Sequence, residues 1–189
     1  MPQDDIAQAL GISRIPVREA LIALEREGWV TIEMHRGAFV NAIDAEGVRD
    51  HYALLGLVYG FAATRALARG GTDLVATLEA IAHQVEEAGD PRRLSELSVR
   101  FLATMVEGAR SPRVKVVLRA MSALVPGEFF VEVPAAVDVQ KRGIAAVARA
   151  LRRGDGDRVA AELLRMMHRV GEKVVDVFES RGLFDVSSA

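Results

Sequence analysis

The sequence has no cysteine among its 189 residues, and this absence excludes several kinds of chemistry at once. Disulfide bonds, thiolate zinc sites and cysteine nucleophiles all require a thiol. A chain without cysteine suits the reducing cytoplasm, which is where we expect the protein to act. The net charge is only −2, so there is no overall positive field of the kind that attracts nucleic acid or anionic membranes.

Long apolar runs and enzyme motifs are also missing. The longest uncharged apolar stretch, residues 52–64, has 13 residues, which is too short to cross a bilayer and predicts a buried helix instead. The first ten residues contain Asp4 and Asp5 and no basic residue, so they do not resemble a signal peptide. There is no glycine-rich phosphate loop, no Gly-x-Ser-x-Gly elbow and no histidine-rich metal spacing. We therefore expect neither a membrane protein nor an enzyme.

The spacing of apolar residues along the sequence changes near residue 28. Apolar residues in 1–27 recur with helical spacing on either side of a short break at residues 11–13, which predicts a helix, a tight turn and a second helix. Residues 28–41 hold two short runs of strand-forming residues around a polar turn with a glycine, which predicts a β-hairpin. This order is typical of a winged helix–turn–helix.

The rest of the chain has helical periodicity almost throughout. Glycine and proline interrupt it at short intervals, which predicts about six helices joined by short loops in an antiparallel bundle. We expect a mainly α fold with a winged helix–turn–helix domain at 1–41, a linker at 42–46 and a helical domain at 47–189. The predicted helices cover residues 46–69, 72–88, 91–109, 111–125, 135–153 and 155–181.

Two arginines stand out on the second predicted helix. Arg14 and Arg18 are four residues apart, so they project from one face, while Val17, Leu21 and Leu24 form another stripe that can pack inward. Arginine suits bidentate contact with a guanine edge or a phosphate. By themselves, two such arginines also fit the solvated face of an ordinary surface helix.

A family resemblance strengthens the first interpretation. Residues 10–21 (LGISRIPVREAL), 24–28 (LEREG) and 36–40 (RGAFV) resemble the DNA-binding domain of the GntR family of bacterial regulators. The resemblance implies that a homodimer binds double-stranded operator DNA with an inverted repeat, and that a small metabolite releases this repressor. It further implies that the DNA-facing residues are those of the second helix and the wing: Ser13, Arg14, Val17, Arg18, Arg36 and Gly37. His35, beside Arg36 at the predicted hairpin tip, is expected to reach an adjacent groove or the DNA backbone as well.

The N-terminal segment departs from the family in two respects. The family's domain normally has another helix before the segment that begins here at Pro2, so this winged helix–turn–helix is truncated. Either the true start lies upstream, or the helix has been cut off or lost, and its loss would expose Ile6, Leu10 and Leu24. Many relatives also have an arginine at the position of Asp4. Residues 1–41 contain four arginines and six acidic residues, a net charge of −2, so we expect weak DNA binding.

The helical region resembles the FCD-type ligand-binding domain of the FadR-like branch of this family. The resemblance covers residues 47–181 and includes Phe101, residues 111–114 (SPRV) and residues 154–157 with His168. Many members of this branch hold a divalent metal with one aspartate and three histidines. Here the corresponding positions are Ser98 and Leu102, no histidine lies between residues 84 and 167, and only His168 matches a ligand. We therefore expect no bound metal and no other cofactor.

The same region suggests a neutral or hydrophobic effector in place of a metal-bound acid. We expect the effector pocket to involve residues from the predicted helices 91–109, 135–153 and 155–181: Ser98, Phe101, Leu102, Met105, Ile144 and His168. An alternative is that the bundle is simply packed and only dimerises. At the level of the whole protein, the alternative to a ligand-responsive regulator is a truncated or degenerate relative that binds a ligand or partner but no DNA.

Overall fold

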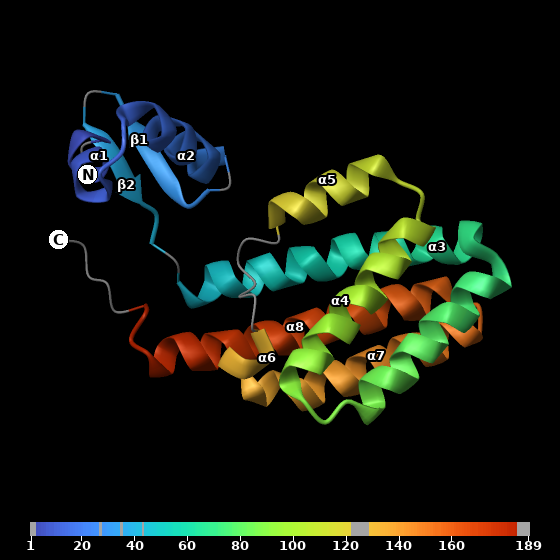
Figure 1. The fold of residues 1–189 in the computed structure, drawn as a ribbon. Coiled ribbons are helices and arrows are strands. Elements are labelled where there is room, and N and C mark those ends of the chain that lie inside the picture. Colours follow the sequence, from blue (N-terminus) through green and yellow to red (C-terminus); the bar gives the residue numbers. More distant parts are fainter. Residues whose placement is uncertain (1–2, 27, 35, 43, 122–128, 185–189) are drawn as a thin grey trace. The chain divides into compact units, whose positions relative to one another are not determined.

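The computed structural model describes residues 3–26, 28–34, 36–42, 44–121 and 129–184. The chain divides into two compact units, residues 1–43 and residues 44–189 (Figure 1). In the described residues, no helix combines the length and apolar character that crossing a membrane requires. The predicted fold class is confirmed: a helix–turn–helix with a two-stranded wing precedes a set of packed helices.

The N-terminal unit contains α1 (Gln3–Leu10), α2 (Arg14–Arg26), β1 (Val30–Glu33) and β2 (Gly37–Val40). The two strands pair antiparallel, with Val30 opposite Val40 and Glu33 opposite Gly37. Both helices and both strands contribute to one small core, against which Ile6, Trp29 and Ile32 pack. The core residues are Ala7, Val17, Leu21, Val30 and Ala38. Leu24, which we expected to pack inward, is 38% exposed and is not part of this core.

The second unit is entirely helical in its described part. Its long helices are α3 (Ala45–Glu87), α4 (Pro91–Gly108), α5 (Pro112–Met121), α7 (Val137–Arg152) and α8 (Gly156–Ser180). Aspartates begin three of them: the carboxylates of Asp44, Asp90 and Asp155 accept hydrogen bonds from backbone amides in the first turns of α3, α4 and α8. Such caps satisfy amides that have no partner within the helix.

The predicted break at residues 70–71 occurs inside α3. Gly71 has φ +65°, a left-handed conformation that interrupts the helical backbone between two straight segments. Glycine adopts this conformation without the steric cost that a Cβ imposes. The predicted helices 46–69 and 72–88 therefore correspond to the two halves of one kinked helix.

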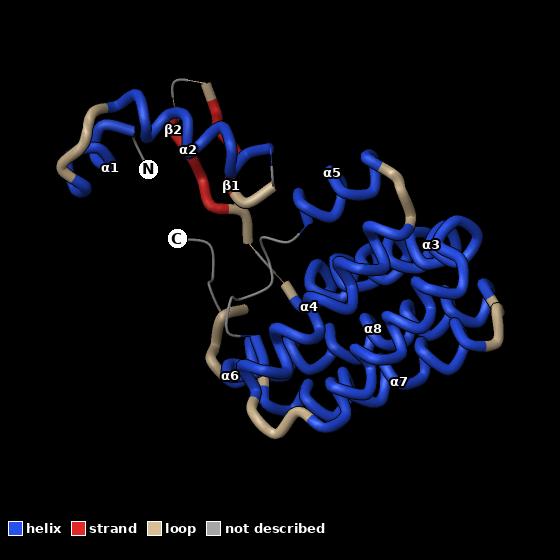
Figure 2. The backbone as a smooth tube through the Cα atoms, turned by 45° about the vertical axis from the view of Figure 1, so that its right-hand side comes forward, coloured by secondary structure: helices blue, strands red, loops and turns tan. Residues whose placement is uncertain are grey.

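Helices α3, α4, α7 and α8 form the body of the unit, with α3 lying along both α8 and α4 and with α7 along α8 (Figure 2). Small residues allow the closest approach, because a Cβ on Gly56 would lie 2.9 Å from the Cα of Leu164. A larger side chain at this position would push α3 away from α8.

The stretch between α5 and α7 is more divided than the sequence predicts. The predicted helix 111–125 is described only to Met121, and its last residues lie outside the described part. A short helix α6 (Phe129–Glu132) and a 3₁₀ turn (Pro134–Ala136) come next, and neither was predicted. These four- and three-residue elements are too short to produce a periodic signal.

Candidate functional site

The N-terminal end of α2 presents polar side chains to solvent. Ser13 directly precedes the helix, and Ser13, Arg14 and Arg18 are all exposed. Val17, which the family resemblance assigns to the DNA-facing set, is only 4% exposed and belongs to the core. That assignment needs correction, because the buried stripe of α2 passes through Val17 and leaves its side chain inaccessible.

The tip of the wing lies beside the outer face of α2. Arg18 and Arg36 line the same surface groove, of about 570 Å³, together with Glu25 and Glu33. Gly37, at φ +103°, starts β2 in a conformation that favours glycine. His35, which we also assigned to this face, lies outside the described residues. The structure thus brings an arginine of the second helix and an arginine of the wing to one concave surface.

Two of these arginines have acidic partners within the same unit. The Nε atom of Arg14 lies 2.6 Å from a carboxylate oxygen of Asp4, and both side chains are largely exposed. Arg36 forms an ion pair with Glu33, and its guanidinium lies over the ring of Phe39, 5.6 Å from the centroid. An anion that binds Arg14 or Arg36 must therefore compete with a carboxylate.

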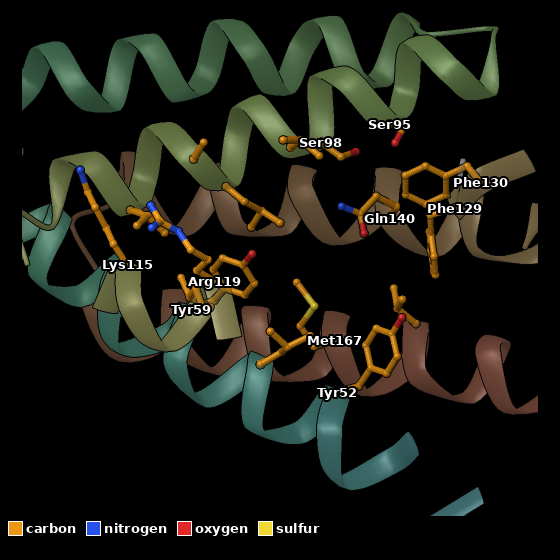
Figure 3. A pocket seen from close by; sticks show the side chains of 17 residues that line it. Tyr52, Tyr59, Ser95, Ser98, Lys115, Arg119, Phe129, Phe130, Gln140 and Met167 are labelled. Carbon is orange, nitrogen blue, oxygen red and sulfur yellow. The ribbon is translucent and has the colours of Figure 1, made fainter. Parts of the chain in front are cut away.

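The helical unit contains a cavity of about 700 Å³. Most of its lining is apolar, and the side chains come from α3, α4, α5, α6, α7 and α8. Figure 3 shows Lys115, Arg119 and Tyr59 towards one end, and Ser98, Gln140 and Phe129 towards the other. This volume lies within the range of pockets that hold small molecules.

The polar groups deepest in the cavity are uncharged. Ser98 and Gln140 are each 4% exposed, and Tyr52 is 2% exposed. In the part of the chain that the structure describes, neither Ser98 Oγ nor Tyr52 Oη has a hydrogen-bond partner. Burial raises the pKa of Tyr52 and of Tyr59 above the usual value for a phenol, so both hydroxyls remain protonated near neutral pH. Each can donate as well as accept a hydrogen bond.

The predicted pocket residues separate into three groups. Ser98 and Leu102 line the cavity. Phe101, Met105 and Ile144 do not: each is 0% exposed in the core between the helices. His168 lies on α8, but its side chain is exposed and does not line the cavity either. These four predicted residues therefore do not line the cavity: three fill the core between the helices, and His168 lies on the solvent side of α8.

The residues present do not fit the metal site of the FadR-like branch. At the matched positions, Ser98 offers a single hydroxyl and Leu102 offers no ligand atom, while His168 faces away from the cavity. Among the residues that the structure describes, no three histidine, cysteine, aspartate or glutamate side chains gather closely enough to hold a metal ion. A divalent metal needs several such donors together.

Sequence reasoning missed four features of the cavity: the hydroxyl of Tyr52, the amide of Gln140 and the rings of Phe129 and Phe130. One signal was available for Gln140, since it lies four residues before the buried Ile144 on the same helix face. A polar residue in an apolar stripe often faces an internal site. No comparable signal marks Phe129 and Phe130, because α6 is a single turn.

Comparison with protein families gives two matches that divide the chain as the structure does. Residues 1–40 match the model described as bacterial regulatory proteins, gntR family. Residues 50–169 match the FCD domain. The first match covers the helix–turn–helix and wing, and the second covers the helices that enclose the cavity.

Individual relatives agree with these matches. An uncharacterised HTH-type transcriptional regulator of Mycobacterium tuberculosis is 32% identical over 128 residues, which are 68% of this chain and 52% of that protein. The Nta operon transcriptional regulator of Aminobacter aminovorans is 30% identical over 46% of this chain and 41% of its own length. This chain thus spans about half the length of these relatives. A GntR family regulator from Pseudomonas syringae has a similar fold, with TM-score 0.65 and 22% identity over 98% of this chain and 79% of its own.

Proposed function

Because this chain belongs to the GntR family of regulators and carries an FCD domain, we propose that it is a transcription regulator. In this proposal, the N-terminal unit binds operator DNA through Ser13, Arg14, Arg18, Arg36 and Gly37, and the cavity of the helical unit binds a small-molecule effector. Effector binding then alters the affinity for DNA.

One observation carries the DNA-binding part of the proposal: Arg18 of α2 and Arg36 of the wing line one groove. A recognition helix enters the major groove with its N-terminal residues on base edges, and an adjacent wing can contact the backbone. Arg14 and Arg18 lie in the first two turns of α2, where such contacts are made. If Arg18 only covered a solvated helix surface, nothing would favour the placement of a second basic side chain, Arg36 of the hairpin, beside it.

The direct test is selection of duplexes from a random DNA library with the purified chain, followed by fluorescence anisotropy on the selected sequence and on a scrambled one. We expect an enriched inverted repeat. The affinity should fall with salt, with a slope of log K against log [salt] no steeper than about −3.6 per protomer, because the unit has only four arginines. Absence of enrichment, or equal affinity for both duplexes, would contradict the proposal.

Asp4 gives a second, independent test. We expect Asp4→Asn to raise DNA affinity about two- to fivefold, because the substitution releases Arg14 from its ion pair and removes a charge that repels phosphate. The measurement is anisotropy on the selected duplex at low salt. Asp73→Asn, which removes one negative charge from the helical unit, is the matched control and should leave the affinity unchanged.

The proposed regulator acts as a homodimer. Leu54, Leu57 and Phe61 are 53%, 57% and 50% exposed, and their spacing places them on one face of α3. Exposed apolar side chains gathered on one helix face are typical of an interface between protein chains. A second copy of this chain is the partner that a palindromic operator requires.

A relative that has lost DNA binding is the second candidate function. Its support is the set of carboxylates beside the arginines: Asp4 on Arg14, and Glu33 on Arg36. In that case the cavity would still bind its ligand, while the Asp4→Asn variant would bind DNA no better than the parent chain.

A further inference from the structure

The chemistry of the cavity limits the kind of molecule that it can hold. Among the described residues that line it there is no aspartate or glutamate, so a buried cationic group would meet no counter-charge from them. Of the two basic residues in the lining, Lys115 has its ammonium 2.6 Å from a carboxylate oxygen of Glu107. Both Lys115 and Arg119 lie on α5, away from the end where Ser98 and Gln140 lie (Figure 3).

The end of the cavity at Ser98 has a different character. Its polar groups are a serine hydroxyl, a tyrosine hydroxyl and a carboxamide, all at least nine-tenths buried. The two hydroxyl oxygens, Ser98 Oγ and Tyr52 Oη, are without a hydrogen-bond partner in the described residues. A buried polar atom without a partner costs free energy, so a ligand group that pairs with it gains correspondingly in affinity.

We propose that the cavity binds an uncharged, largely apolar molecule, without a metal ion, through a hydroxyl or carbonyl group that hydrogen-bonds the buried hydroxyl of Ser98 or of Tyr52. The apolar body of the ligand lies against apolar side chains of the lining, among them Leu55, Leu102 and Met167. An ionised carboxylate is disfavoured at the Ser98 end, because it would lose its hydration without meeting a positive charge. This inference rests on the proposed role of the cavity as the effector site.

The experiment compares three probes with the same chain length and different head groups: 1-octanol, octanoate and octylamine at pH 7.5. Each is titrated against the full chain loaded with the uncharged fluorescent dye N-phenyl-1-naphthylamine, and dye displacement is recorded before and after dialysis against EDTA. We expect octanol to displace the dye at a concentration at least tenfold lower than the two ionised probes, with no effect of EDTA. Tighter displacement by octanoate or octylamine, or loss of octanol binding after EDTA, would overturn the proposal.

Two variants that each delete one oxygen test the anchor. At least one of Ser98→Ala and Tyr52→Phe should raise the octanol concentration needed by about three- to tenfold. The melting temperature of the ligand-free chain should stay equal or rise, because each substitution removes a buried polar atom that has no protein partner. Ser180→Ala, at an exposed hydroxyl that donates to the carbonyl of Val177, is the matched control and should leave displacement unchanged. Equal octanol binding in all variants would show that octanol binds without the hydroxyls of Ser98 and Tyr52, and would contradict the inference.

A final measurement separates this inference from the proposed function. Anisotropy on the selected duplex is repeated with the octanol-saturated chain. If octanol meets the criteria above but leaves DNA affinity unchanged, the ligand class stands and its role as an effector fails. If DNA binding is specific but no probe distinguishes the variants, the regulator stands and the ligand class fails.

Discussion

Replacing Arg18 by alanine is expected to weaken binding to the selected duplex by about 1–3 kcal/mol, roughly a five- to 150-fold rise in Kd. Arg18 is exposed in the second turn of α2, lines the groove that Arg36 also lines, and is not the partner of Asp4. The reason for the large effect is that a guanidinium can form two parallel hydrogen bonds to a guanine edge, and alanine forms none. Anisotropy with the parent and variant chains measures the change.

The control for Arg18 is another arginine on the same helix. Arg26 is the last residue of α2, about two turns from Arg18, and Arg26→Ala removes the same charge from the unit. It should weaken binding only slightly, and equally on selected and scrambled duplexes. Arg14→Ala should cost less than Arg18→Ala, because Arg14 must first leave Asp4. If Arg18→Ala and Arg26→Ala weaken DNA binding equally, Arg18 does not contribute to recognition of the DNA sequence.

The fold of the N-terminal unit could be predicted because its signals are local. The glycine at residue 11, the change from helical to strand spacing near residue 28 and the glycine at residue 37 each mark a boundary within a few residues. The ion pairs could not be predicted in the same way. Asp4 is ten residues from Arg14 in sequence, and only the packing of α1 on α2 brings the two side chains together.

The cavity was harder to predict than the fold that surrounds it. Ser98, Phe101, Leu102 and Met105 all lie on the broad inner side of α4, and periodicity identifies that side without saying which residues meet another helix and which meet open space. The difference depends on how the neighbouring helices pack against α4, and the spacing of residues along α4 does not specify that packing. Sequence spacing therefore locates the core-facing side of the helix, and tertiary packing decides where that side becomes a cavity.

The difference between core and cavity leads to a second large effect. Phe101→Ala should lower the free energy of unfolding of the helical unit by about 3–5 kcal/mol, because Phe101 is fully buried and the substitution leaves an unfilled space. Far-UV circular dichroism during urea unfolding reports mainly on the helical unit. The fluorescence of Trp29, the single tryptophan, reports on the N-terminal unit, where its side chain packs against the core. The dichroism transition should move to lower urea while the tryptophan transition stays in place.

Leu102→Ala is the matched comparison for Phe101→Ala, since Leu102 is the next residue on α4 but lines the cavity and is only partly buried. Its side chain already borders open space, so its removal should cost less than about 2 kcal/mol, below the range for fully buried leucines. Octanol displacement should show the reverse order. Leu102→Ala should weaken octanol binding more than Phe101→Ala, because Leu102 contacts the proposed ligand and Phe101 does not. If Phe101→Ala costs under about 1 kcal/mol and abolishes octanol binding, Phe101 lines the cavity, as the sequence alone suggested, and the division of α4 into a core face and a cavity face is wrong.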